Sequence, residues 1–126
     1  MKKTIVALVV ILFGFTLTTP AQAKAIKTGS YYIEMQDPDT ALYVKPAKRT
    51  AVIRVPDKVT REGYTIRIIG IKKQNLKKVK KVYLGKNIFI IPKNAFKGYK
   101  GRIFAYKTGF AAVKKAGKGK YKLIRR

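Results

Sequence analysis

The chain has 126 residues, with 30 lysine or arginine, 5 aspartate or glutamate and no histidine, which gives a formal net charge of +25 at pH 7. Because histidine and cysteine are both absent, the chain lacks imidazole and thiolate metal ligands, the usual neutral-pH general base and any Ser-His or Cys-His nucleophile pair. The excess of cations favours an anionic partner, and lysines that only increase solubility are the alternative.

The start of the chain, at 1–23, has the layout of a secretory signal peptide. Lys2 and Lys3 precede an apolar run at 5–17, and Ala-Gln-Ala at 21–23 forms a small-x-small cleavage pattern. The run is shorter than the roughly 20 residues of a transmembrane helix. No lipidation cysteine follows it, because the chain has none. We therefore expect a protein that is secreted or associated with the cell surface, with a mature domain at 24–126.

The cations are concentrated in the second half of the chain. Residues 24–60 carry seven basic and four acidic side chains, whereas residues 61–126 carry 21 basic side chains and one acid, Glu62. An asymmetry of this kind between two halves of a chain is typical of binding to an anionic partner.

The start of the mature chain predicts a β-hairpin. After a lead-in at 25–30, β-forming residues at 30–35 and 41–44 flank a turn at 36–40, which contains a proline between two aspartates. A loop of five or six residues is expected. We assign residues 24–50 to an N-terminal hairpin that caps the rest of the domain.

The middle of the chain predicts short elements, and Pro56 and Gly70 are expected to end the first two strands. The expected elements are strands at 51–56, 64–69 and 79–85, a loop at 57–64, one or two helical turns at 72–78, a loop that leads to an extended segment at 86–92 and a single helical turn at 94–97.

The C-terminal part predicts a strand at 102–106, a helix at 108–115 and a last strand at 121–124. Thr108 is expected to cap the start of the helix and Gly117 to end it. No longer helix is expected, so the predicted fold class is β-rich α+β with one or two short helices.

An internal repeat is visible in the middle of the chain. The segments 52–59 and 81–88 each consist of an apolar strand, a proline or glycine, two polar residues and a β-branched residue, at an offset of 29. The strand at Val82 recurs at Ile103, an offset of 21. A repeat unit with one apolar face must bury that face against its neighbours, so the pattern predicts stacked units.

Val-Tyr-Leu-Gly-Lys-Asn-Ile at 82–88, followed by Ile91 and by Asn-Ala-Phe-Lys-Gly at 94–98, resembles the BspA-like class of bacterial leucine-rich repeats. The resemblance covers about residues 52–124, with Pro92 in place of the usual glycine. It implies a short leucine-rich-repeat-like solenoid of about two units at 51–126, closed by a C-terminal helix and strand. It also implies a role in adhesion or protein contact. Phe96 is then expected to be buried under a turn at 93–99.

The acidic residues give little support to catalysis or metal binding. Asp37 and Asp39 could pair in a hydrolase or form a weak calcium loop. Aspartates beside a proline are, however, common in turns because their side chains bond to the local backbone. We expect no enzyme activity, no metal and no cofactor.

The remaining candidate is a basic surface that would bind polyanions. Lysine predominates over arginine, which favours diffuse attraction to phosphate or carboxylate polymers over bidentate base recognition. Tyr83, Tyr99, Phe104 and Tyr106 are interleaved with the cations, and packing in the core or the caps is the expected role for most of them. The candidate surface consists of two sequence clusters: Lys72, Lys73, Lys77, Lys78, Lys80 and Lys81 in the first, and Lys114, Lys115, Lys118, Lys120, Lys122, Arg125 and Arg126 in the second.

Two functional hypotheses follow. In the first, a secreted cationic repeat protein binds a macromolecular partner or a cell surface. In the second, a cationic effector or wall-retained protein acts on anionic envelope polymers or membranes. The expected partner is a protein or an anionic surface polymer; a membrane surface is a further candidate, and nucleic acid would bind only through non-specific charge.

Overall fold

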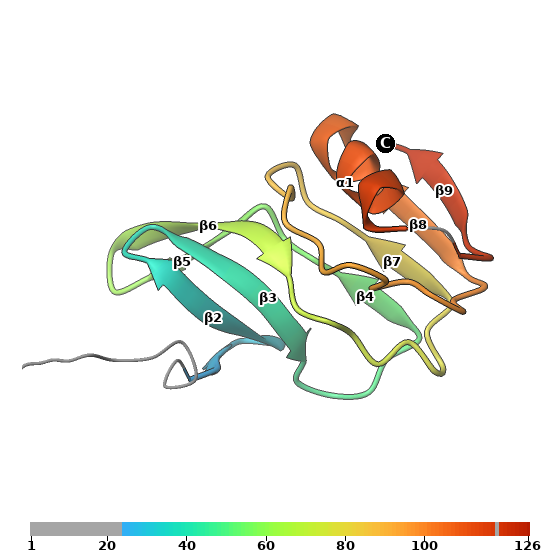
Figure 1. The fold of residues 1–126 in the computed structure, drawn as a ribbon. Helices are drawn as coiled ribbons and strands as arrows, with labels where there is room; N and C mark the ends of the chain where they lie inside the picture. Colours follow the sequence, from blue (N-terminus) through green and yellow to red (C-terminus); the bar gives the residue numbers. More distant parts are fainter. Residues whose placement is uncertain (1–23, 118) are drawn as a thin grey trace, which may run out of the picture.

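The computed structural model describes residues 24–117 and 119–126, and the expected signal peptide at 1–23 lies outside them. Two β-sheets lie side by side, with one helix at the C-terminal end (Figure 1). The prediction of a mostly β chain with a short C-terminal helix is therefore confirmed. The elements are β1 (Ile26–Thr28), β2 (Tyr31–Asp37), β3 (Thr40–Pro46), β4 (Val52–Arg54), β5 (Lys58–Arg61), β6 (Tyr64–Ile71), β7 (Lys81–Tyr83), β8 (Arg102–Ala105), α1 (Lys107–Ala116) and β9 (Lys122–Arg125).

The second sheet is entirely parallel, in the order β4-β7-β8-β9. Val52 pairs with Lys81, and Lys81 pairs with Arg102, so the two offsets read from the sequence are the true strand register. Parallel neighbours need a crossover of a dozen or more residues, and these offsets provide it.

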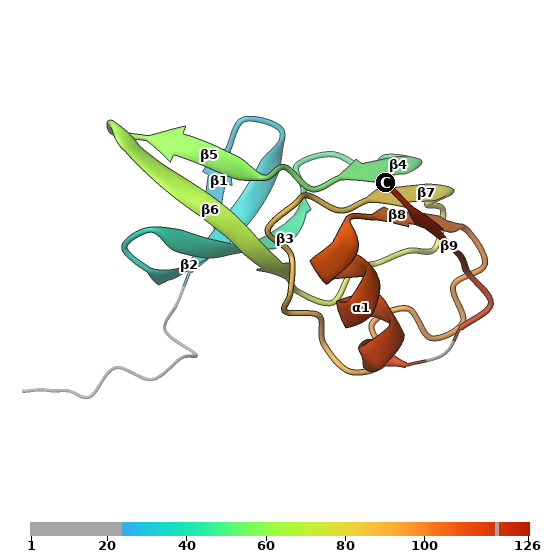
Figure 2. The ribbon, with the colours of Figure 1, turned by 90° about the horizontal axis from the view of Figure 1, so that it is seen from above.

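The inner side of the parallel sheet contributes to a core that it shares with the five-stranded sheet. The central residue of each of the first three strands is at most 1% exposed, namely Ile53, Val82 and Ile103. The helix α1 contributes the fully buried Val113 and lies along the inner face of this sheet (Figure 2).

The turn at 93–99 follows the sequence prediction. Phe96 is 3% exposed, and the segment forms turns rather than a strand. Asn94 and Gly98 have positive φ angles of 61° and 80°, which close the turn over the Phe96 ring. The ring meets Tyr121 edge to face at 5.8 Å between centroids, so the turn is tied to the segment that leads into β9.

The first sheet has the order β1-β2-β3-β6-β5. The predicted hairpin is present as β2 and β3, which pair antiparallel, and β3 then pairs in parallel with β6. Strands from both sides of residue 50 therefore share this sheet. The domain boundary at residue 50 stays a prediction.

Gly70, near the end of β6, contacts the crossover that leads from β7 to β8. It bridges to Ile90, and the Ile71 N–H donates to the Ile90 carbonyl at 3.0 Å. A Cβ atom at Gly70 would lie 2.6 Å from both the Cβ and the carbonyl oxygen of Ile90. Only glycine allows the two segments to come this close.

Several local predictions on the five-stranded sheet are wrong. The lead-in at 25–30 contains β1, which pairs with β2. The β2–β3 connection is a tight turn of two residues rather than five or six, and the Asp39 N–H donates to Asp37 Oδ1 at 3.2 Å. The expected loop at 57–64 contains β5, because Glu62 and Gly63 take positive φ angles of 50° and 80° and close a hairpin onto β6.

Two helix predictions also need correction. No helix forms at 72–78, where the Gln74 amide donates to the carbonyls of Val44 and Lys72 at 2.8 Å and holds the chain in an irregular course. The N-cap of α1 is Tyr106, without a side-chain cap, because the Thr108 hydroxyl donates to the Lys86 carbonyl at 3.2 Å instead. Gly117 ends the helix as predicted.

Candidate functional site

The solvent side of the parallel sheet, called here the outer face, carries two rows of side chains. Since successive residues of a strand point to opposite sides, the residues flanking each buried central position share this face. None of these eight residues is buried. The first row is Val52, Lys81, Arg102 and Lys122, and the second is Arg54, Tyr83, Phe104 and Ile124.

The second row forms a ladder of aromatic rings and cations. Tyr83 and Phe104 stack with their centroids 4.5 Å apart and their planes 8° apart. The Arg54 guanidinium lies 4.5 Å from the Tyr83 centroid. Arg126 lies 5.4 Å from the Tyr83 centroid and 4.5 Å from the Tyr106 centroid, and its Nη1 donates to the Leu84 carbonyl at 2.8 Å. Each cation–π contact restricts a long side chain, so the ladder presents a pre-ordered surface.

Three of the four side chains in the first row are positively charged. Lys81, Arg102 and Lys122 are direct neighbours across three strands. Like charges in adjacent positions of a sheet repel one another. An anionic partner placed along this row would relieve that repulsion and gain the attraction of three cations.

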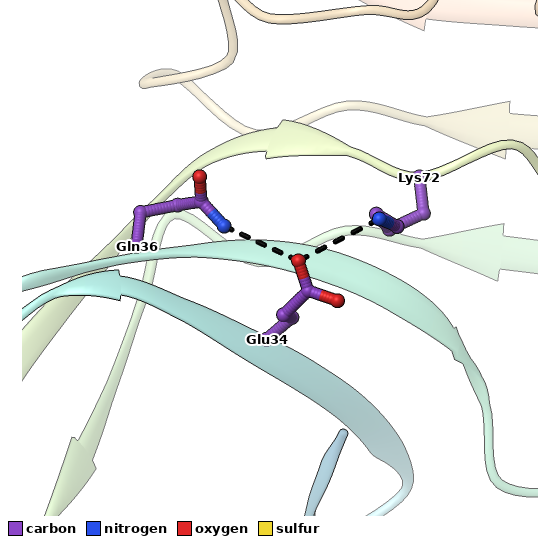
Figure 3. Close-up of polar contacts among 3 residues, drawn as sticks. All are labelled: Glu34, Gln36 and Lys72. Carbon is purple, nitrogen blue, oxygen red and sulfur yellow. Dashed lines mark hydrogen bonds and ion pairs between the residues drawn. The ribbon is translucent and has the colours of Figure 1, made fainter. Parts of the chain in front are cut away.

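Lys72 is set apart from the other predicted cations. Its ammonium lies 3.5 Å from Glu34 Oε2, which also accepts a hydrogen bond from the Gln36 amide at 3.4 Å (Figure 3). Within residues 24–117 and 119–126, this is the one ion pair found. Its carboxylate partner reduces the contribution of Lys72 to any polyanion surface.

The rest of the first sequence cluster is divided among three places. Lys81 joins the outer face, while Lys80 is exposed just before β7. The remaining members line two cavities together with cations that are distant in sequence. Lys77 and Lys78 share one cavity with Lys45 and Arg49, and Lys73 and Lys77 share another with Lys97 and Lys100.

Sequence reasoning missed the four partner cations of these cavities. Lys97 and Lys100 lie in the crossover between β7 and β8. The repeat offset between these two strands could have predicted that this crossover lies beside the segment before β7. Lys45 and Arg49 lie at the end of β3 and just after it, and they have no counterpart in the repeat. Only the three-dimensional course of the chain brings them to Lys77.

The second sequence cluster is also divided. Lys122 and Arg126 belong to the outer face. Lys114 and Lys115 are exposed in the last turn of α1, where cations favour the helix dipole. Lys120 and Arg125 are exposed, and Lys118 lies outside the described residues. Among the described members of the two clusters, Lys81, Lys122 and Arg126 lie on the outer face. That the thirteen cations form a polyanion-binding surface stays a prediction.

The four interleaved aromatic residues divide in the same way. Tyr99 is buried, as expected for core packing, and burial raises its pKa. Tyr83, Phe104 and Tyr106 are only half-buried and support the cations of the outer face, a role that the sequence did not indicate.

Two further observations concern the described part of the chain. No group of three or more acidic side chains there is placed to hold a metal ion. None of its helices has the length and apolar character needed to cross a membrane.

The structure resembles the crystal structure of a leucine-rich cell surface protein from Faecalibacterium prausnitzii A2-165, with a TM-score of 0.55 and 23% sequence identity. The match covers 82% of this chain and 27% of that chain, so the present protein spans about a quarter of its length. At this identity the likeness concerns the fold. No protein-family model matches the sequence, and no curated protein matches it.

Proposed function

We propose that this chain is a secreted, non-catalytic binding protein that uses the outer face to hold a macromolecular partner at a cell surface. The observation that carries the proposal is the stacked pair of Tyr83 and Phe104 with Arg54 and Arg126 beside it. The fold likeness to a leucine-rich cell surface protein supports the surface location.

The physical case rests on the kind of residues that the ladder presents. Tyrosine and arginine are enriched among the residues that dominate binding energy at protein interfaces. Side chains that are already ordered lose less entropy when a partner arrives. The flanking row of Lys81, Arg102 and Lys122 would accelerate encounter with an acidic partner and orient it.

We further infer a short solenoid of the BspA-like leucine-rich-repeat type. Consecutive turns are linked by similar hydrogen bonds. The Lys86 N–H donates to Asp57 Oδ1 at 2.6 Å, the Asn87 amide donates to the Asp57 carbonyl at 3.0 Å, and the Thr108 hydroxyl donates to the Lys86 carbonyl at 3.2 Å. Stacked units that contact only their neighbours place one strand of each unit in a shared sheet, as in β4-β7-β8-β9.

The second candidate function is diffuse attachment to anionic envelope polymers. It is favoured by the lack of any acidic residue after Glu62. Attachment of this type depends on screened charge and disappears at high ionic strength. Binding through the outer face keeps a contribution from apolar and stacked contacts that salt does not remove.

Isolated bacterial envelopes and host cells, each titrated with the mature protein at low and high salt, separate the two functions. The variant Tyr83→Ala/Phe104→Ala removes the ladder and keeps every charge. The variant Lys81→Ala/Lys122→Ala removes two charges of the first row and keeps the ladder. Loss of high-salt binding only in the first variant supports the outer face. Equal binding of wild type and the first variant at both salt concentrations contradicts it. Inorganic polyphosphate serves as the probe of charge alone, because it has no bases or acyl chains to contact the aromatic ladder.

A further inference from the structure

A second site includes none of the eight outer-face residues and is lined by segments that precede β7 and β8, within 73–79 and 94–101. It is a cavity of about 680 Å3, called here the turn cavity. Its volume is in the range of cavities that bind small ligands. Four lysines line it, namely Lys73, Lys77, Lys97 and Lys100, and no acidic residue does.

Two buried polar atoms of its lining residues have no hydrogen-bond partner. They are Gln74 Oε1 and the Tyr99 hydroxyl, in side chains that are 9% and 6% exposed. Buried polar groups are almost always paired, so two such atoms at one cavity call for an explanation. An unpaired buried polar atom destabilises the folded protein, and a ligand that forms the missing hydrogen bond would remove this cost.

The chemistry of the two atoms is complementary. The Gln74 amide nitrogen already donates to the carbonyls of Val44 and Lys72, so Gln74 offers only an acceptor. The Tyr99 hydroxyl is protonated at neutral pH, as in any tyrosine, and burial raises its pKa further, so it offers a donor. A ligand hydroxyl group both donates and accepts, and it matches either atom.

We propose that the turn cavity binds a saccharide that carries acidic groups. Its hydroxyl groups bond to Gln74 and Tyr99, and its carboxylate, phosphate or sulfate groups face the four lysines. Protein covers both polar atoms in the free molecule, so the ligand hydroxyl groups reach them only when the covering atoms shift, while the Gln74 amide keeps its bonds to the Val44 and Lys72 carbonyls.

An acidic peptide fits the turn cavity less well. Peptides are commonly held by main-chain hydrogen bonds to a free strand edge. Here the backbone N–H groups of Val79, Lys97 and Tyr99 are already used, by the carbonyls of Leu76, Asn94 and Phe96 at 3.0–3.2 Å. The cavity therefore recognises its ligand through side chains.

The first test is calorimetric titration of the mature protein with galacturonate tetrasaccharide, chondroitin sulfate tetrasaccharide and neutral maltotetraose. We expect the acidic tetrasaccharides to bind about tenfold or more tightly than the neutral one. A preference between the two acidic probes supports the proposal. Equal binding of maltotetraose, or tighter binding of a tetra-aspartate peptide, overturns it.

The second test uses matched variants. Lys97→Ala/Lys100→Ala should weaken binding of the acidic tetrasaccharide about tenfold. Lys114→Ala/Lys115→Ala removes the same charge from α1 and should leave it within about twofold. Equal losses in the two variants would show that charge alone is responsible and overturn the proposal.

Tyr99→Phe is the sharpest variant, because it removes the unpaired hydroxyl and keeps the ring. A merely structural residue would leave saccharide binding unchanged. We expect binding to weaken about fivefold, with an unchanged or higher melting temperature. Unchanged binding overturns the proposal. Tyr83→Ala/Phe104→Ala should retain saccharide binding, so this site and the outer face can fail independently.

Discussion

The two sheets of this molecule differ in how they balance their charges. All five acidic residues lie in or beside the five-stranded sheet, and Glu34 there pairs with Lys72. The parallel sheet has no acid, and its cations rest on aromatic rings or stand next to one another. An anionic partner can therefore pair with the cations of the parallel sheet, which have no acidic neighbours in that sheet.

The sheets also differ in how they are held together. Most strands of the five-stranded sheet pair with a neighbour in sequence through a tight turn. Each parallel strand pairs with a strand that is separated from it by a long crossover, so its stability depends on the side chains stacked beneath the crossovers. Three substitutions or conditions test this contrast.

Phe96→Ala should have the largest effect, because Phe96 fills the core under the turn at 93–99. We expect a loss of about 4 kcal/mol in the free energy of unfolding, measured by chemical denaturation. Phe89 is 59% exposed, and Phe89→Ala serves as the control, with an expected change below about 0.5 kcal/mol. Similar costs for the two substitutions would contradict the stacked core.

Gly70→Ala tests the contact between β6 of the five-stranded sheet and the crossover that leads from β7 to β8. Its new Cβ would meet the Ile90 backbone, and we expect a cost of about 3 kcal/mol. Gly109→Ala is the control, since a Cβ there meets nothing closer than 3.5 Å and alanine favours the helix by roughly 0.5–1 kcal/mol. Both sheets should lose stability in one transition for Gly70→Ala. Two separate transitions would show that the sheets are energetically independent.

Tyr43 makes the five-stranded sheet sensitive to high pH. Burial, with a smaller contribution from the charge of Tyr31, raises the pKa of Tyr43 to about 12 from the ordinary value of 10.0. The unfolded chain therefore releases this proton first as the pH rises, and stability that is fully present below pH 10 falls up to pH 12. We expect a fall of about 2 kcal/mol across this window.

Tyr43→Phe removes this titration and should flatten the decrease in stability between pH 10 and pH 12. Denaturation curves of both proteins across this window provide the measurement. A variant that loses as much stability as the wild type would assign the decrease to other groups.

The parallel sheet could be predicted from the sequence because its signal is a repeat. Val82 and Ile103 recur with the register that the structure shows, and Phe96 marks the turn between them. β1 and β5 were missed because their strands are short and their pairing depends on turns at Gly29 and Gly63 with positive φ angles. Short polar strands carry little periodicity, so composition suggested a lead-in and a loop.

Of the candidate site, the sequence predicted only that it would be rich in cations. The sequence named Lys81, Lys122 and Arg126, but it placed them in two separate clusters, and it missed Arg54, which contacts the Tyr83 ring. The long crossovers between parallel strands determine which cations become neighbours. The side of each strand that packs in the core determines which aromatic rings face solvent. Local sequence encodes neither.

The central claim is that the ladder of Tyr83 and Phe104, rather than net charge, holds the partner of the outer face. The most direct measurement is the dissociation constant for isolated envelopes or host cells at about 1 M salt, where charge attraction extends only about 3 Å. We predict that the wild type still binds there and that Tyr83→Ala/Phe104→Ala weakens binding at least about tenfold. Binding that disappears at high salt for the wild type, with no difference between the two proteins at low salt, would contradict the account.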